Sequence, residues 1–182
     1  MIKKISLFFL LLIPFNVFAL EKVKFDKCVD GDTAYFIYKG ESSKFRFLSI
    51  DTPESTSKVE EYGKEASEFT CKELKQAKKI EIEFEKNSTD KDKYDRYLVY
   101  VFVDGELLQE KLLYNGLAEL KYDKNSYKYE DKLYKAEQHA KDNLIGIYST
   151  KKYQEELEEN LLFYLKKWSK KLLSSILKEL FD

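Results

Sequence analysis

The order of strand-like and helix-like segments predicts an α+β fold built on a five-stranded β-barrel. Three segments with β-type alternation come first, a helical segment follows, and two more strand-like segments come after it. Turn residues separate most neighbouring strands. Three strands, one helix and two strands is the order of the Greek-key barrel known as the oligonucleotide/oligosaccharide-binding (OB) fold. About three helices should pack against this barrel, and a C-terminal amphipathic helix should follow it.

The first three strands are expected at residues 22–29, 34–38 and 43–50. Asp30-Gly31-Asp32-Thr33 turns the chain between the first and second strands. Lys39-Gly40-Glu41 has the composition of a hairpin turn between the second and third strands. These short connections predict that the three strands are antiparallel neighbours.

The later elements follow the same periodicities. Two further strands are expected at residues 80–84 and 97–103, and helices at residues 60–77, 107–114 and 129–141. Asn115-Gly116 is typical of the end of a helix. A charged loop, residues 87–95, leads into the fifth strand. Residues 21–149 are therefore expected to form one domain.

Residues 150–182 form a separate helical extension. Apolar residues recur there at three- and four-residue steps: Leu157, Leu161, Leu165, Trp168, Leu172, Ile176 and Leu180. Lysines cluster in the middle of the segment, at positions 166, 167, 170 and 171. The longest apolar run has five residues, too few to cross a bilayer. Three interpretations of residues 154–182 are open: packing on the barrel, pairing with another helix, or contact with an anionic membrane surface.

The N-terminus predicts a signal peptide at residues 1–19. Lys3 and Lys4 precede an apolar run over residues 5–18, and Val17-Phe18-Ala19 supplies small residues at a cleavage site. The alternative is an uncleaved anchor, for which the run is short and is interrupted by Pro14. Cleavage would leave an exported protein, periplasmic or extracellular, with a membrane-associated location depending on the C-terminal extension.

Charge and cysteine content exclude some functions. Removal of Lys3 and Lys4 takes the formal charge from −1 to −3, which is not that of a protein that coats nucleic acid. Cys28 and Cys71 either form a disulfide in an exported protein or remain free thiols. His139, the single histidine, is expected on the surface of a helix, which excludes mechanisms that need two histidines.

Residues 45–54 have the most unusual composition of the chain. Alternation places Phe45 and Phe47 on one face, with Arg46, Leu48 and Ile50 on the other. The chain has only two arginines, Arg46 and Arg96, among 32 basic residues, and an arginine fork suits phosphate or carboxylate.

Arg46 precedes the sequence Asp51-Thr52-Pro53-Glu54, in which Pro53 fixes the backbone between the two acids. This stretch also has an ordinary interpretation. Arg46 would then be a structural ion-pair partner, and the acids would belong to a turn with a helix cap.

Acids and arginines at strand ends suit phosphodiester hydrolysis. Asp32, Asp51 and the Thr52 carbonyl supply oxygen ligands of the kind that Ca²⁺ prefers. Glu54 is a candidate base for an attacking water. Arg46 and Arg96 are candidate donors to the charge that develops on the phosphate. These residues come from separate strand ends, which can converge in a small barrel.

The chain resembles the staphylococcal nuclease (thermonuclease) family from about residue 23 to residue 149. The matching motifs, in order, are Asp30-Gly31-Asp32-Thr33, Phe45-Arg46, Asp51-Thr52-Pro53-Glu54, Tyr62-Gly63-Lys64-Glu65-Ala66, residues 91–96 and Gly116-Leu117-Ala118. The resemblance implies an OB-fold and Ca²⁺-dependent hydrolysis of DNA and RNA.

The resemblance also assigns roles to individual residues. It implies metal ligands at Asp32, Asp51 and Thr52, and catalytic residues at Arg46, Glu54 and Arg96. It further implies nucleotide contacts from Lys93, Tyr94 and Tyr122.

Two positions depart from the family pattern. Asp95 stands where the family usually has glycine, and its carboxylate is expected to pair with Arg96 and weaken phosphate binding. Lys124 stands where a second aromatic residue is often found. The alternative function is therefore a catalytically weak nucleic-acid-binding module on the same barrel.

Overall fold

The computed structural model describes residues 20–56, 58–121 and 127–181 and confirms the α+β barrel. Its strands are β1 (Glu21–Cys28), β2 (Thr33–Tyr38), β3 (Glu41–Phe47), β5 (Ile80–Phe84) and β6 (Tyr97–Val103). They lie in the order β3-β2-β1-β5-β6, and a parallel pairing of β3 with β6 closes the barrel. All other neighbouring pairs in this ring are antiparallel.

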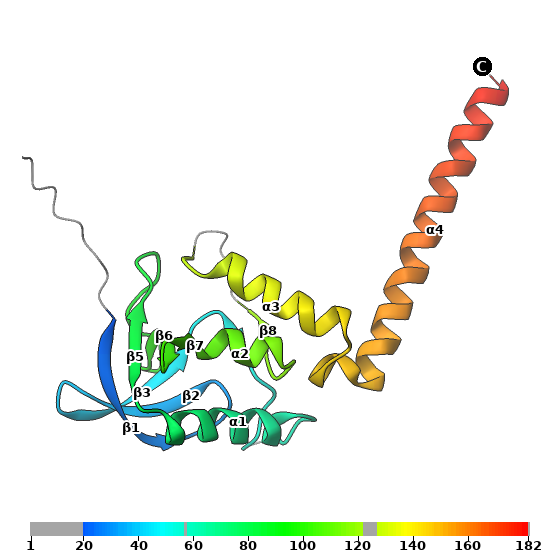
Figure 1. The fold of residues 1–182 in the computed structure, drawn as a ribbon. Coiled ribbons are helices and arrows are strands. Elements are labelled where there is room, and N and C mark those ends of the chain that lie inside the picture. Colours follow the sequence, from blue (N-terminus) through cyan, green and yellow to red (C-terminus); the bar gives the residue numbers. More distant parts are fainter. Residues whose placement is uncertain (1–19, 57, 122–126, 182) are drawn as a thin grey trace, which may run out of the picture.

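Helices cover the barrel from one side and one end (Figure 1). They are α1 (Gly63–Gln76), α2 (Leu108–Tyr114), α3 (Glu130–Asp142), a short 3-10 turn η1 (Gly146–Ser149) and α4 (Lys151–Phe181). Three two-residue strands complete the fold: β4 (Ile50–Asp51), β7 (Glu106–Leu107) and β8 (Glu119–Leu120). β4 pairs with β8 in a separate antiparallel ladder.

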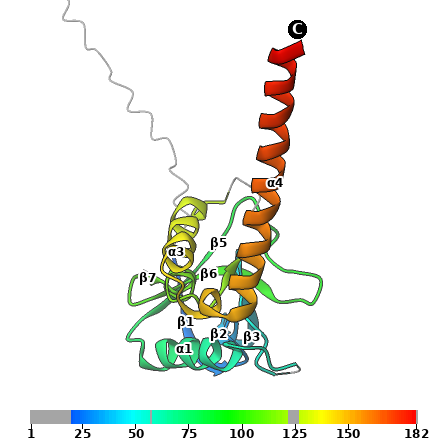
Figure 2. The same cartoon turned by 90° about the vertical axis from the view of Figure 1, so that its right-hand side faces the viewer.

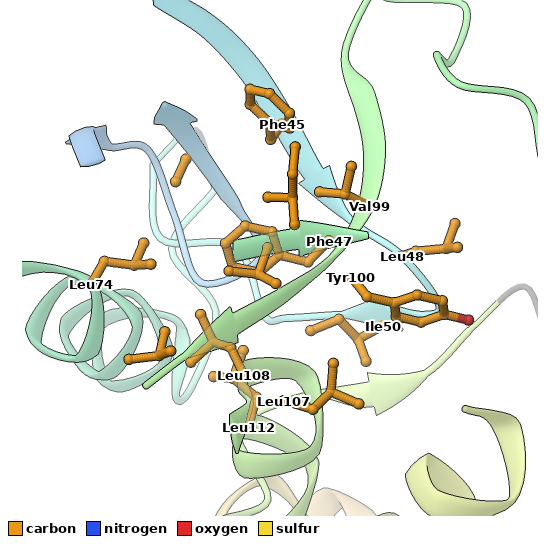
Figure 3. Packing of buried hydrophobic residues seen from close by; sticks show 14 of the residues in the cluster. Phe45, Phe47, Leu48, Ile50, Leu74, Val99, Tyr100, Leu107, Leu108 and Leu112 are labelled. Carbon is orange, nitrogen blue, oxygen red and sulfur yellow. The ribbon is translucent and has the colours of Figure 1, made fainter. Parts of the chain in front are cut away.

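The core fills the barrel and its contact with the helices (Figure 3). Phe45 and Phe47 point inward from β3, as their alternation predicts, and both are buried. Leu74 of α1 and Leu112 of α2 pack onto the same cluster. Each fully buried side chain of this size contributes about 1.5–3 kcal/mol to folding, so the barrel is a rigid support for the groups at its strand ends.

The third strand is shorter than predicted. β3 ends at Phe47, and Ser49 has a positive φ of 68°, which breaks the alternation. Leu48 and Ile50, expected on the face of Arg46, are instead buried. The break redirects the chain into β4, which carries Asp51 across to β8.

Helix α1 begins three residues later than the predicted start at residue 60. Tyr62 has a positive φ of 68°, so the helix cannot extend back through it. The following Gly63 lies against the loop after β4, where an added Cβ would come within 2.2 Å of the Glu54 carbonyl oxygen. At the other end of the chain, α4 begins at Lys151 rather than at residue 154.

A disulfide joins Cys28 at the end of β1 to Cys71 in α1, with their Cα atoms 5.7 Å apart. This is the bonded alternative of the two that the sequence left open. His139, expected on the surface, is partly exposed and stacks on the ring of Tyr114 with centroids 3.8 Å apart.

Helix α4 extends away from the barrel (Figures 1 and 2). Side chains over residues 154–176 are exposed, including Leu161 and Trp168, so this stretch does not pack on the barrel. Over the described residues, no helix is both long and apolar enough to cross a membrane. The predicted signal peptide, residues 1–19, lies outside the described residues.

Candidate active site

Arg46 gathers two carboxylates from different elements. Its Nη2 donates to Asp51 Oδ1 at 2.7 Å, and its Nη1 forms an ion pair with Asp32 Oδ2. The β2–β3 register pairs Thr33 with Arg46, which brings the preceding Asp32 beside the guanidinium. We call Asp32, Arg46, Asp51 and Thr52 the carboxylate–arginine cluster.

The carboxylate–arginine cluster is tied together through backbone groups. The Thr52 N–H donates to Asp32 Oδ2 at 2.9 Å, and the Thr33 hydroxyl donates to Asp32 Oδ1 at 2.9 Å. Gly31 packs so tightly on Thr52 that an added Cβ would lie 2.7 Å from its Oγ1. The buried Thr70 hydroxyl of α1 holds the Gly31 carbonyl at 2.6 Å.

Arg46 keeps donor capacity beyond these contacts. A guanidinium carries five N–H donors, and the described contacts of Arg46 use one oxygen of Asp32 and one oxygen of Asp51. An underused buried guanidinium donor is unfavourable unless a further acceptor completes it. A phosphate oxygen is such an acceptor.

Burial and crowded negative charge disfavour ionised carboxylates here. Burial and the charge of Asp32 raise the pKa of Asp30 to about 6. Burial also raises the pKa of Asp51, although Arg46 opposes the shift. The two carboxylates that converge on the Arg46 guanidinium are hard oxygen donors of the kind that Ca²⁺ prefers. Over the described residues, no group of three or more histidine, cysteine or acidic side chains is arranged to hold a metal ion, so this site offers only two carboxylates together with backbone oxygens.

Glu54 has a fixed backbone and an exposed side chain. Its N–H donates to Glu60 Oε2 at 3.1 Å, and its carbonyl accepts from the Glu60 N–H at 2.9 Å. Gly63 packs against the same carbonyl. The carboxylate is thus presented to solvent two residues beyond Thr52, without direct contact with Arg46.

The second arginine lies on the loop before β6. Arg96 Nε donates to Asp92 Oδ2 at 2.7 Å, and its Nη2 forms an ion pair with the same oxygen at 2.7 Å. The Arg96 guanidinium lies 5.4 Å from the centre of the Tyr94 ring. Lys93 approaches the same ring at 4.9 Å. We call residues 87–96 the arginine loop.

The predicted pair between Asp95 and Arg96 is wrong. Asp95 bonds instead to Lys91 at 2.8 Å, and Arg96 is held by Asp92. The φ of Asp95 is 62°, which explains why glycine suits this position and why aspartate, tolerant of left-handed backbone, can replace it.

The arginine loop and the carboxylate–arginine cluster lie on adjacent strands. β3 and β6 are parallel neighbours, with Phe45 opposite Tyr97 and Arg46 opposite Leu98. Both arginines therefore lie beside the β3–β6 pairing that closes the barrel, although they do not touch each other directly. Of the remaining predicted residues, Tyr122 lies outside the described residues, as does Lys124.

A hollow of about 480 Å³ opens beside Asp51 and Thr52. Its far wall is formed by the start of α4, including Lys152 and Tyr153. Carboxylates outnumber lysines in its lining, with Asp51, Glu60, Glu61, Glu119 and Glu156 against Lys58, Lys121 and Lys152. The balance of charge in this hollow favours a cation over a phosphate that arrives without one.

Sequence reasoning missed three residues that shape the site. Asp92 clamps Arg96, and its position four residues before a rare arginine was the available signal. Asp30 adds a third acid to the loop before β2. Gly63 permits the close approach to Glu54, which depends on tertiary packing that no local pattern reveals.

Comparison with known proteins identifies the family of this chain. The family model described as staphylococcal nuclease homologue matches residues 44–150. Endonuclease YncB of Bacillus subtilis is 42% identical over 139 residues, covering 74% of this chain and 64% of the relative. The SPbeta prophage-derived endonuclease YokF of the same organism is 43% identical over 139 residues, covering 74% of this chain and 46% of the relative.

A thermonuclease of Staphylococcus hyicus is 36% identical over 126 residues, covering 68% of this chain and 73% of the relative. The chain thus spans less than two thirds of the length of the two Bacillus relatives and more of the staphylococcal one. The family match includes the end of β3, both arginines and the Asp-Thr-Pro-Glu sequence. The barrel fold is consistent with these matches. The chain therefore belongs to the staphylococcal nuclease family.

Proposed function

We propose that this protein is an exported, Ca²⁺-dependent nuclease that hydrolyses phosphodiester bonds of DNA and RNA with little sequence specificity. The carboxylate–arginine cluster is the observation that carries the proposal. It combines carboxylate oxygens suited to a hard cation with a guanidinium that has further N–H donors for a phosphate oxygen. The relatives named as endonucleases and thermonuclease support the same chemistry.

Each residue of the site has a defined role in this proposal. Asp32, Asp51 and the Thr52 carbonyl would hold Ca²⁺, which supplies positive charge to a phosphate oxygen when bound. Arg46 and Arg96 donate hydrogen bonds to the phosphate oxygens as negative charge develops there.

Glu54 accepts a proton from water, whose oxygen forms a bond to phosphorus while the bond to the leaving sugar oxygen breaks. Lys93, Tyr94 and Tyr122 are proposed to contact the adjoining nucleotide, by charge or by ring stacking.

The test is digestion of plasmid DNA and of RNA with Ca²⁺, with Mg²⁺ or with a chelator. Wild type is expected to cut both substrates only with Ca²⁺, and Glu54→Gln is expected to lose at least 10²-fold in rate. Glu68→Gln, an exposed acid on α1, is the matched control and should retain wild-type activity. Tight binding of single-stranded DNA without cleavage by wild type would favour the catalytically weak binding module instead.

We also propose that residues 1–19 direct export and are removed after Ala19. The basic start, the apolar run and the small residues before position 20 support this. A disulfide suits an oxidising compartment outside the cytoplasm. N-terminal sequencing of protein recovered from the producing cell should begin at Leu20, and a chain that begins at Met1 would refute removal.

Helix α4 is proposed to lie on an anionic membrane surface. Its middle holds Lys166, Lys167, Lys170 and Lys171, and no acid lies between Asn160 and Leu177. Trp168 and the leucines around it are exposed on the same helix. A basic polar face combined with an aromatic and aliphatic face is typical of helices that lie in a membrane interface.

The main alternative for α4 is self-association as a coiled coil. A coiled coil needs apolar side chains at alternating three- and four-residue steps. With Trp168 in either core position, Ser175 falls in the seam, and one of the two frames also places Lys171 there. The repeat is therefore not sustained, which favours the membrane surface.

Vesicle sedimentation tests the role of α4. Full-length protein should bind vesicles that contain phosphatidylglycerol and not pure phosphatidylcholine, and a chain truncated after Tyr153 should bind neither. Replacing the four lysines by glutamine should weaken binding by about 1 kcal/mol per lysine. Equal binding to both vesicle types, or a dimer that the truncation abolishes, would contradict the proposal.

A further inference from the structure

The outer face of β1, β2 and β3 carries a row of basic and aromatic side chains. Register pairs Lys27 with Tyr35 and Tyr35 with Lys44, so the three side chains stand side by side on one face. The Lys27 ammonium lies 4.4 Å from the centre of the Tyr35 ring. We call Lys27, Tyr35 and Lys44 the strand row.

The strand row leads directly to the carboxylate–arginine cluster. Lys44 lies two residues before Arg46 on β3, a distance of about 7 Å along the strand, and shares its face. Tyr97 is opposite Phe45, so the residues before them, Arg96 and Lys44, are neighbours across the β3–β6 pairing. Lys44, at one end of the strand row, is therefore a neighbour of both arginines.

The two lysines of the strand row are not neutralised by the rest of the fold. Neither Lys27 nor Lys44 forms an ion pair with a carboxylate in the described part of the chain. Asp26, next to Lys27 in sequence, instead accepts a hydrogen bond from Ser42 at 2.5 Å. Some other lysines of the fold are paired, as Lys79 is with Glu81 and Lys111 with Glu73.

The charges around the carboxylate–arginine cluster favour binding of a polyanion on the side of the strand row. On the side of Asp51, the hollow of about 480 Å³ has more carboxylates than lysines. On the side of Lys44, the strand row is cationic and carries an aromatic ring. The face of the second and third strands is also where OB-folds in general bind oligonucleotides.

We propose that the strand row is a second binding site for single-stranded nucleic acid, which holds nucleotides next to the one being cleaved. This proposal rests on the proposed nuclease function. Lys44 and Lys27 contact successive phosphates that lead away from the scissile one. Tyr35 contacts the intervening nucleotide with its ring, as aromatic residues do in single-strand-binding grooves.

Salt-dependent binding tests the strand row. The protein carries Glu54→Gln so that DNA is not cut, and a labelled single strand of about 15 nucleotides is titrated by fluorescence anisotropy. The variant Lys27→Ala/Lys44→Ala is compared with Lys72→Ala/Lys75→Ala, which removes the same charge from exposed positions of α1. Thermal melts confirm that both variants fold.

Loss of two phosphate contacts should lower the magnitude of the slope of log K against log salt by about 1.4. The affinity gap between parent and Lys27→Ala/Lys44→Ala should accordingly narrow about sevenfold between 50 and 200 mM salt. The α1 control should keep the parental slope. Tyr35→Leu should weaken binding without changing the slope, because a ring contact releases no counterion.

Two outcomes separate the strand row from the nuclease proposal. If wild type cuts DNA but Lys27→Ala/Lys44→Ala binds with the slope and affinity of the α1 control, the strand row is refuted and the nuclease is not. If wild type never cuts DNA but the slope falls only in Lys27→Ala/Lys44→Ala, the nuclease is refuted and the strand row is not.

Discussion

The two arginines of the site are held in different ways. Arg46 is 11% exposed and is fixed by acids from two other elements, Asp32 before β2 and Asp51 in β4. Arg96 is 25% exposed and is fixed by Asp92, an acid of its own loop. The first guanidinium is part of the tertiary structure, whereas the second depends on local contacts.

Because of this difference, we expect Arg46 to contribute to both stability and activity, and Arg96 mainly to activity. Arg46 neutralises acids whose positions are set by strand register, so its loss affects folding and activity together. The pair of Arg96 with Asp92 is nearer the surface, where an ion pair contributes little to stability. In the proposed reaction, Arg96 exchanges its carboxylate partner for a phosphate, and the exposure of this pair lowers the cost of that exchange.

The largest effects are expected from removing each guanidinium. Arg46→Ala should lower kcat/KM by at least 10²–10³-fold and lower the free energy of unfolding by about 3 kcal/mol, because Asp32 is left buried without its partner. Arg96→Ala should lower kcat/KM by a similar factor and the free energy of unfolding by less than about 1 kcal/mol. Nuclease assays measure kcat/KM and urea titrations measure the free energy of unfolding. Equal losses of stability in the two variants would contradict the difference between the two arginines.

Loss of the disulfide should weaken the side that carries Arg46. Cys28 lies two residues before Asp30, and Thr70 beside Cys71 holds the Gly31 carbonyl. Cys28→Ala/Cys71→Ala should lower the free energy of unfolding by about 4 kcal/mol for a loop of this length. Hydrogen exchange should speed up at the Thr52 amide more than at the Arg96 amide, and the reverse order would contradict this assignment.

Asp92→Asn should show through pH how much the pair of Arg96 with Asp92 contributes to the free energy of unfolding. Burial alone would raise the pKa of Asp92, but the hydrogen bonds from Arg96 prevail and lower it. A carboxylate with a lowered pKa stabilises the fold above its unfolded value of about 3.9, and this contribution disappears as pH falls through the folded value. The free energy of unfolding of wild type should therefore exceed that of Asp92→Asn by about 1 kcal/mol at neutral pH, and the two should converge as pH falls below the lowered pKa of Asp92. Urea titrations across pH would show a constant gap if this were wrong.

Asp95→Gly should have the smallest effect. Asp95 pairs with exposed Lys91 and not with Arg96, so removing it should leave kcat/KM unchanged. Glycine relieves the positive φ and should change the free energy of unfolding by less than about 1 kcal/mol. A large gain in activity would mean that Asp95 restrains Arg96 after all.

Much of the fold could be predicted because local patterns and tertiary packing agree. Alternation located Phe45 and Phe47 in the core, and the strand order predicted the barrel. The break at Ser49 was not predictable, because Leu48 and Ile50 continue an alternating pattern that packing overrides. The site residues at Asp32, Arg46 and Asp51 were predicted, and the structure brings them together.

The partners of individual charges were harder to predict. Asp92 lies four residues before Arg96 and Asp95 lies directly before it, and the sequence does not show which of the two acids contacts the guanidinium. The left-handed backbone at Asp95 is a conformation that no local pattern indicated. The exposure of α4 was equally open, since an amphipathic pattern does not say what covers its apolar face.

Arg46 on β3 and Arg96 on the arginine loop are proposed to act on one phosphate. The most direct test is kcat/KM for Arg46→Lys, Arg96→Lys and the double variant on one DNA substrate, since lysine keeps the charge but not the fork. Groups that act as a unit give losses far from additive, so the double variant should lose much less than the product of the single losses. Independent, strictly multiplicative losses would contradict the account.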